Sequence, residues 1–518
     1  MLRRFLVLLV LGASAVAAQP LTLHSINAQP SGAFGNVVAS AGDVTGDGVD
    51  DVLVGAWNEW WYDRQAGRAY VHDGATGALV HAFRSPEAEW AGAFGIALAS
   101  VGDLDADGVP DLAIGAPDEN GGGRVYLFSG ATGEALGALA EPEGSIAYGY
   151  AIAPAGDVDG DGTPDILVGD YKRLSESGAV SVVSGATGQA LHVLAPDAPI
   201  ALAHFGRALA GGADVTGDGV ADWIVAARGE EVEGVAGGRV YVISGATAET
   251  VRRLVSPQPT DGGQFGLSVA LCPDVDGDGA AEIAVGAGRE TGDQTAQGHA
   301  YLFSGAAGDL LQSYASPSPA ANGWFGQSVA CTGDLDGDDA GDLVVGAAGE
   351  TDGATRSGTV YVMSTGTGEP LAQVSSPTEL ADGRFGVWVA ALDGDTPRIA
   401  VGASREGELS DGAVHLVTVV RETVAGEARP ADAADVGLPS PNPARTHVAV
   451  SVVLPAAAPV RVWLVDVQGR TVAEAPVGTL AAGTHRVAVG TAGLAAGTYL
   501  MRVHVGERTE TRRFTLVR

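Results

Sequence analysis

The sequence predicts an all-β protein built from repeats of about 60 residues, and two patterns that keep register with each other predict it. The first is an acidic phrase, Asp-x-(Asp/Thr)-x-Asp-Gly-x-x-(Asp/Glu), whose last copy has Asp339 in place of glycine. It starts at Asp43, Asp103, Asp157, Asp214, Asp274 and Asp334. The second is an aromatic–glycine pair ahead of each phrase, and it occurs seven times. The pairs are Phe34-Gly35, Phe94-Gly95, Tyr148-Gly149, Phe205-Gly206, Phe265-Gly266, Phe325-Gly326 and Phe385-Gly386.

Each repeat contains four short strands in a constant order, as the first repeat shows. Strands are expected at 37–40, 51–55, 68–73 and 78–83, with the acidic phrase between the first two and a Gly-Ala-Thr-Gly turn before the last. Four short strands per repeat are typical of one blade of a β-propeller. The third-strand pattern occurs seven times, but no fourth strand follows its last copy, Gly412–Val417. Leu21–Ser25 resembles the missing strand, so we expect seven blades closed by the amino-terminal strand.

The acidic phrase predicts a metal site, because it places oxygen-bearing side chains at positions 1, 3, 5 and 9 around a sharp turn. Oxygen ligands without His or Cys select a hard cation, and a flexible loop suits calcium better than magnesium. The seventh repeat has only Asp393-Gly394-Asp395-Thr396-Pro397-Arg398, with an arginine where the last ligand belongs, so we expect no ion there. We expect the ions to hold the blades together and not to perform chemistry.

The aromatic–glycine pair, the acidic phrase and the following Val-Gly-Ala (Val54-Gly55-Ala56, and Val345-Gly346-Ala347) resemble the FG-GAP repeats of integrin alpha-chain propellers. The resemblance covers about residues 20–420. It implies up to six calcium ions, each held by four side chains and one backbone carbonyl. The implied ligands are Asp43, Thr45, Asp47, Val49, Asp51; Asp103, Asp105, Asp107, Val109, Asp111; Asp157, Asp159, Asp161, Thr163, Asp165; Asp214, Thr216, Asp218, Val220, Asp222; Asp274, Asp276, Asp278, Ala280, Glu282; and Asp334, Asp336, Asp338, Ala340, Asp342.

Composition limits the environment and the partners of the chain. The 518 residues carry a net charge of −34, part of which bound calcium would cancel, and the remainder argues against nucleic acid as a partner. Residues 1–18 combine Arg3 and Arg4, an apolar run and small residues, which is typical of a secretory signal cleaved before Gln19. No segment is long and apolar enough for a transmembrane helix, so we expect an exported, soluble protein.

The only two cysteines, Cys272 and Cys331, lie in equivalent strands of adjacent repeats. Two interpretations stay open at this point. The thiols form a disulfide between neighbouring blades in an oxidising compartment, or they are two buried free thiols in a tightly packed core.

Strand alternation assigns the loops to two faces. The acidic loops share one face with the Gly-Ala-Thr-Gly turns, while the loops between strands two and three and between blades share the other, where we expect a ligand. One loop on that second face is rich in aromatic residues, and an inter-blade tryptophan neighbours it. These candidate ligand-binding residues are Trp57, Trp60, Trp61, Tyr62 and Trp90. They suit stacking on carbohydrate or a protein contact, or alternatively they pack on one another to order the loop.

The carboxy-terminal part differs from the repeats. Residues 421–440 are rich in Ala, Glu, Asp and Pro and are expected to be a linker between a propeller at 19–420 and a small immunoglobulin-like sandwich at 441–518. Pro441-Asn442-Pro443, Val465–Arg470, Gly493–Tyr499 and the basic end resemble a type A sorting domain of type IX secretion. The resemblance implies contact with that secretion machinery and a place outside a Gram-negative cell, either released or on its surface.

The sequence contains no familiar catalytic motif, and its ten histidines lack metal-ligand spacing. The leading hypothesis is therefore a secreted or cell-surface calcium-binding propeller that acts as a binding or adhesion module toward an extracellular protein or glycan. The alternatives are a secreted hydrolase or lyase acting on polysaccharide or phosphoester, and a structural component of a surface layer.

Overall fold

The computed structural model describes residues 20–418 except 61–64, 197–199, 339, 352–355, 379, 395–396 and 408. It also describes residues 9–10, 13–14, 435–436, 447–454, 457–465, 470–475, 478–481, 483–491, 494, 497–505 and 508–516. The chain divides into two compact units, one that runs to Arg421 apart from residues 276–279 and one that runs from Glu422 to Arg518. Each unit is described separately below.

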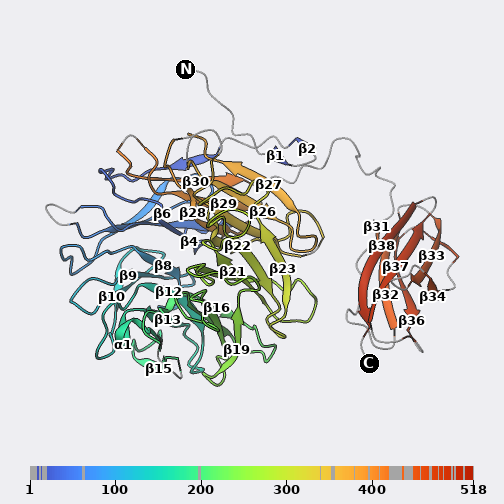
Figure 1. The fold of residues 1–518 in the computed structure, drawn as a ribbon, viewed down its shortest axis with the longest axis horizontal. Coiled ribbons are helices and arrows are strands. Elements are labelled where there is room, and N and C mark those ends of the chain that lie inside the picture. Colours follow the sequence, from blue (N-terminus) through green and yellow to red (C-terminus); the bar gives the residue numbers. More distant parts are fainter. Residues whose placement is uncertain are drawn as a thin grey trace, which may run out of the picture. The chain divides into compact units, whose positions relative to one another are not determined.

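The first unit is a series of antiparallel sheets, most of them formed by four strands that follow one another in sequence (Figure 1). Among the described residues of this unit there are seven sheets: six have four strands and one has six, and one of the four-stranded sheets takes a strand from the other end of the chain. The first three are β4 (Val37–Gly42), β5 (Asp51–Ala56), β6 (Arg68–His72), β7 (Leu79–Phe83); β8 (Ala97–Ser100), β9 (Leu112–Ala116), β10 (Arg124–Phe128), β11 (Ala135–Leu139); and β12 (Ala151–Gly156), β13 (Asp165–Asp170), β14 (Ala179–Val183), β15 (Ala190–Leu194), with the short helix α1 (Arg173–Glu176) after β13.

The next three sheets keep the same order. They are β16 (Phe205–Ala213), β17 (Asp222–Ala227), β18 (Arg239–Ile243), β19 (Thr250–Val255); β20 (Ser268–Cys272), β21 (Glu282–Ala287), β22 (His299–Phe303), β23 (Leu310–Ala315); and β24 (Phe325–Cys331), β25 (Leu343–Ala347), β26 (Thr359–Met363), β27 (Pro370–Ser375). Two short strands of the segment expected to be a signal, β1 (Leu9–Val10) and β2 (Ala13–Ser14), extend the last of these sheets through β27. The all-β class and the repeated four-stranded unit are thus confirmed.

The last sheet takes its fourth strand from the other end of the chain. It consists of β28 (Phe385–Leu392), β29 (Arg398–Ala403), β30 (Ala413–Thr418) and β3 (Leu21–Leu23). Strand β3 pairs antiparallel with β30, with Leu21 opposite Leu416 and Leu23 opposite Val414. The first strands of successive sheets contact one another, and β28 also contacts β4, so the blue and orange sheets of Figure 1 are neighbours. The sheets therefore follow one another around a centre and fit a β-propeller.

Most neighbouring sheets pack so closely at one level that a glycine stands there, although the fourth sheet has Ala226 at this position. A side-chain carbon on Gly55 of β5 would lie 2.1 Å from the carbonyl oxygen of Gly95 in the next repeat. Gly95 itself has a φ of +88°, which other residues rarely adopt. The same approach joins Gly402 of β29 to the carbonyl of Gly35 at 2.0 Å, which links the last sheet to the first. The glycines of the two sequence patterns thus set the spacing between sheets.

The aromatic residue of each pair fills the space that this spacing leaves. All seven rings are at most 2% exposed, and Phe34 lies against Tyr70 with ring centroids 5.6 Å apart. Second strands such as β5 and β13 are buried along their whole length, because they are covered on both faces by neighbouring sheets. Small apolar residues dominate these strands for that reason.

The carboxy-terminal unit contains two antiparallel sheets. One has the order β31 (Asp435–Val436), β32 (His447–Leu454), β36 (Gly483–Gly490). The other has the order β34 (Thr471–Ala475), β33 (Ala458–Val465), β37 (Gly497–Val505), β38 (Arg508–Leu516), and β35 (Thr479–Leu480) pairs with β33. Leu454 and Val487 of the first sheet share a buried cluster with Val462 and Met501 of the second. Strand β31 lies inside the range that the sequence predicts to be a linker.

None of the described helices has the length and apolar character that crossing a membrane requires.

Candidate functional site

Each acidic loop is a tight connection between the first two strands of a sheet, closed by its last carboxylate. In the first loop, Asp51 is fully buried and accepts hydrogen bonds from the backbone N–H groups of Val44 and Thr45, both at 2.9 Å. Its other oxygen accepts from the N–H of Gly74, at 2.9 Å, in the turn between β6 and β7. Burial is the largest influence on this carboxyl and raises the pKa of Asp51. The closing residue therefore ties the loop to a turn of the same sheet.

The first and fifth positions of the loop are held by the backbone in the same way. Asp43 accepts from the N–H groups of Gly46 and Gly48, at 2.7 and 2.8 Å, and Asp47 accepts from Val49 at 2.9 Å. Equivalent bonds hold the first and fifth positions in loops that start at Asp103, Asp157 and Asp214. The acidic side chains are thus oriented by backbone donors, as a preformed cation site requires.

In four loops the structure brings three or four carboxylates together, with one oxygen of each within 4.8 Å of the others. The groups are Asp103, Asp105, Asp111; Asp157, Asp159, Asp165; Asp274, Asp276, Asp278, Glu282; and Asp334, Asp336, Asp342. The remaining two loops have Thr45 and Thr216 at the third position. The buried hydroxyl of Thr216 has no hydrogen-bond partner in the described part of the chain. An all-oxygen donor set and an unpaired buried hydroxyl fit a hard cation.

The sixth loop departs most from the others. Burial, reinforced by the charges of Asp336 and Asp338, raises the pKa of Asp342 to about 7. In this repeat Thr365 replaces the turn glycine of the other repeats, and its hydroxyl donates to the carbonyl of Gly341. Asp339, which replaces the glycine inside the loop, lies outside the described residues.

The seventh loop makes a protein contact where the other loops have their last carboxylate. Arg398 donates from its guanidinium to the carbonyls of Gly74 and Ala75, the latter at 3.0 Å, in the turn of the first sheet. The N–H of Asp50 also donates to the carbonyl of Asp393 at 2.9 Å. A cationic side chain thus joins the last sheet to the first at this face.

A second buried acidic series, which the sequence analysis missed, lies at the opposite end of the second strands. In six repeats a glutamate follows Ala-x-x after the second strand, and each is at most 2% exposed: Glu59, Glu119, Glu230, Glu290, Glu350 and Glu406. Five of them accept a hydrogen bond from a tyrosine of the third strand, as Tyr361 donates to Glu350 at 2.6 Å. The recurring Ala-x-x-Glu spacing is the sequence signal that could have revealed them.

These glutamates also connect adjacent sheets. Ser85, which follows β7 of the first sheet, donates to Glu119 of the second sheet at 2.9 Å. Burial raises the pKa of Glu350 to about 7, against the opposing effect of its hydrogen bonds from Ser316 and Tyr361. In the seventh sheet burial is again the largest single influence on Glu406. The hydrogen bond with His415 at 3.0 Å and the charge of His415, together with Thr378 and His24, nevertheless lower its pKa. The buried glutamates thus form hydrogen bonds within and between sheets on the face away from the acidic loops.

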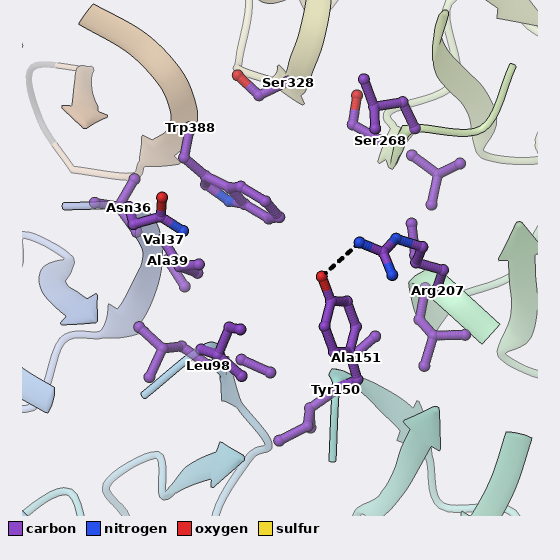
Figure 2. Close-up of a pocket in the computed structure, with 18 of the residues that line it drawn as sticks. Asn36, Val37, Ala39, Leu98, Tyr150, Ala151, Arg207, Ser268, Ser328 and Trp388 are labelled. Carbon is purple, nitrogen blue, oxygen red and sulfur yellow. Dashed lines mark hydrogen bonds between the residues drawn. The ribbon is translucent and has the colours of Figure 1, made fainter. Parts of the chain in front are cut away.

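A pocket of about 460 Å³ lies at the start of the first strands, on this same face. First strands of all seven sheets line it, including Val37 of β4, Leu98 of β8, Ser268 of β20, Ser328 of β24 and Trp388 of β28. Figure 2 shows Trp388 pointing into the pocket from one side, with Tyr150 and Arg207 opposite. The structure thus has a central cavity at the end of the first strands away from the predicted metal loops.

The predicted aromatic residues divide into two environments. Trp57 lines the central pocket and is half-buried. Trp60 and Trp90 lie edge to face with ring centroids 5.4 Å apart and are 39% and 60% exposed. Trp61 and Tyr62 lie outside the described residues. The pair Trp60–Trp90 therefore packs on itself while still presenting aromatic surface.

Cys272 at the end of β20 and Cys331 at the end of β24 are joined as a disulfide, with Cα atoms 5.2 Å apart. The bond links the fifth and sixth sheets near their acidic loops.

Comparison with known proteins identifies the repeats. The model of the FG-GAP repeat matches residues 94–128, 148–183, 265–303 and 325–363, and that of the secretion system C-terminal sorting domain matches 440–517. The chain contains FG-GAP repeats and a secretion sorting domain. The predicted resemblance to integrin alpha-chain repeats and to the sorting domain is confirmed.

The FG-GAP region is similar to several integrin alpha chains. It is 36% identical over 152 residues to integrin alpha-7 of Homo sapiens, which is 26% of this chain and 12% of that protein. Identity is 37% over 169 residues to integrin alpha-IIb of Homo sapiens, or 29% of this chain and 16% of that protein. To integrin alpha-PS2 of Drosophila melanogaster the identity is 33% over 171 residues, which is 27% of this chain and 11% of that protein. The chain thus spans less than a fifth of the length of these relatives.

Proposed function

We propose that this chain is a secreted or cell-surface binding module, a seven-bladed FG-GAP propeller that calcium stabilises and that binds its ligand on the face opposite the calcium loops. The observation that carries the proposal is the pairing of two features at opposite ends of the same strands. Clustered carboxylates lie at one end, and a pocket of about 460 Å³ lies at the other. The similarity to integrin alpha chains supports a role in binding or adhesion.

Calcium is proposed for the six acidic loops because their donors are oxygens held in place by the backbone. Three or four acidic groups at close range repel one another strongly, and a divalent cation removes that repulsion. The ligand set is the one named from the sequence, including the carbonyls of Val49, Val109, Thr163, Val220, Ala280 and Ala340. Each bound ion stabilises the folded chain by mass action, in proportion to the logarithm of its concentration over the dissociation constant.

The sheet order and the contact of β28 with β4 support the proposed number of seven blades. The carboxy-terminal unit, with two antiparallel sheets around one apolar cluster, is proposed to be an immunoglobulin-like sandwich of residues 441–518. The match to a sorting domain supports export by a type IX pathway to the surface or the medium. A signal at 1–18 and a linker at 421–440 complete the proposed organisation.

The central pocket favours binding over hydrolysis or lyase chemistry. Among the described residues that line it there is no carboxylate, histidine or cysteine, while aromatic rings, amides and guanidinium groups are present. Such a lining offers contacts for a ligand and lacks the paired titratable groups of a general acid–base site.

An array of extracellular glycans and matrix proteins, probed with the purified chain in calcium and in chelator, tests the proposal. We expect saturable binding to one ligand class that is lost when calcium is removed and regained when it is restored. Trp388→Ala is expected to weaken that binding without lowering the melting temperature, because this ring is 38% exposed in the pocket. Full binding by the variant would exclude the pocket as the ligand site.

A further inference from the structure

We propose that the central pocket binds a carboxylate-bearing sugar, a uronic acid unit of an extracellular polysaccharide, through Arg207 and Arg228. This inference rests on the proposed binding function and names the ligand class for that site. Three observations carry it: the charge of the lining, the lack of a carboxylate partner for these arginines, and the mixture of rings and short polar side chains around them.

The pocket is positively charged in a strongly acidic chain. The chain carries a net charge of −34, yet the only charged residues among the described lining are Arg207 of β16 and Arg228, which follows β17. A third cation, Arg289, is close enough to Arg228 to influence it electrostatically. A local excess of positive charge inside a negative surface attracts an anion specifically to this point.

Arg207 is held in place by neighbouring groups of the protein. The guanidinium of Arg207 lies over the rings of Tyr150 and Tyr171, 4.5 and 4.4 Å from their centroids. It also donates to the Tyr150 hydroxyl at 2.7 Å (Figure 2). Only one of its five N–H groups is used in that bond. A fixed guanidinium with free donors is suited to a planar, bidentate partner such as a carboxylate.

Within the described part of the chain, no carboxylate forms an ion pair with Arg207, Arg228 or Arg289. The nearby Glu176 contacts His204 at 3.2 Å instead. Burial and the charges of Arg207 and Arg289 lower the pKa of Arg228 to about 10. Unpaired guanidinium groups that repel one another raise the free energy of the empty pocket, and a bound anion reverses that effect.

The rest of the lining matches a sugar better than an acidic peptide. Trp388 is 38% exposed and presents an aromatic face, and Trp57 also lines the pocket. Asn36, Ser268 and Gln327 add short polar groups that can exchange hydrogen bonds with hydroxyls. An aromatic platform with several neutral polar groups suits the apolar face and the hydroxyls of a pyranose ring. An acidic peptide would use the arginines but would leave these neutral groups unpaired.

The test is calorimetric titration of the full chain at saturating calcium with digalacturonate and dimannuronate, compared with neutral digalactose and with tetraglutamate. Arg207→Gln and Arg228→Gln remove the pocket charges one at a time. Arg356→Gln is the matched control, because that arginine is half-buried, lies over Trp324 and is absent from the lining. Thermal unfolding of each variant establishes that the fold is intact.

We expect one of the two uronates to bind at least tenfold more tightly than digalactose, and the affinity to fall as salt is added. Each pocket variant should weaken that binding about tenfold or more, while Arg356→Gln leaves it unchanged. Binding of digalactose with equal affinity, binding of tetraglutamate alone, unchanged affinity in both pocket variants, or no heat with either uronate would each overturn the inference. If the array still finds a neutral glycan or a matrix protein as ligand, the proposed binding function stands and only the acidic sugar fails.

Discussion

The buried glutamate Glu350 provides a quantitative test of the buried glutamates that connect neighbouring sheets. Its carboxyl is 2% exposed and its pKa is raised by burial from 4.5 to about 7. Because the pKa is higher in the folded chain, the protonated form is favoured by folding. Its contribution to stability is complete below pH 4.5 and is lost as the pH rises to about 7. At about 1.4 kcal/mol for each pH unit, the loss amounts to about 3 kcal/mol.

The perturbation is Glu350→Gln, which keeps the shape and an acceptor for the Tyr361 hydroxyl but stays neutral at every pH. Urea unfolding at fixed saturating calcium gives the free energy of unfolding of both proteins at pH 4.5 and pH 8. The difference between them should change by about 3 kcal/mol over this interval, with the native protein relatively more stable at low pH. Using the difference cancels the other raised carboxyls, such as Glu59 and Glu119.

Glu369→Gln in the same sheet is the control, because that side chain is exposed and should show no such change. The free energies of unfolding of the native protein and of Glu350→Gln could differ by the same amount at both pH values. That result would refute the argument that burying this carboxyl raises its pKa and destabilises its charged form.

Two further predictions concern the contacts that join sheets. Arg398→Ala should lower the free energy of unfolding by about 2 kcal/mol, since it leaves the carbonyls of Gly74 and Ala75 without their charged donor. Arg356→Ala, which removes a half-buried arginine that pairs with Asp382, should lower it far less. Equal effects of the two variants in urea unfolding would contradict the role of Arg398. Replacing both Cys272 and Cys331 by serine should lower it by about 3 to 4 kcal/mol, because the disulfide spans 59 residues of sequence. An unchanged melting curve in reductant and in the double variant would show that the bond contributes no stability.

Much of the fold could be predicted because the sequence repeats itself. The distance from Phe34-Gly35 to Phe94-Gly95 gives the size of one unit, and Gly55 and Gly95 mark where neighbouring sheets touch. The metal loops could be predicted for a related reason, since all their side-chain ligands lie within nine consecutive residues. Local patterns of this kind can be recognised in the sequence without knowledge of the tertiary structure.

The parts that were missed depend on residues that are distant in sequence. Glu119 resembles an ordinary solvated loop residue until the fold places Ser85 and Tyr126 beside it. Arg207 lies in a repeat position that differs from unit to unit, and nothing local shows that this position converges on the centre. Trp57 was predicted as part of an aromatic loop, but it lines the central pocket while Trp60 pairs with Trp90.

Calcium binding by the chelator-treated chain tests the central claim most directly. Calorimetric titration with calcium, followed by thermal melts, should show saturable binding and a higher melting temperature, since each site at one hundred times its dissociation constant adds about 2.7 kcal/mol. Asp157→Ala should remove one ion from the stoichiometry, because Asp157 belongs to a single carboxylate group. An absence of binding heat together with identical melting curves in calcium and in chelator would contradict the account.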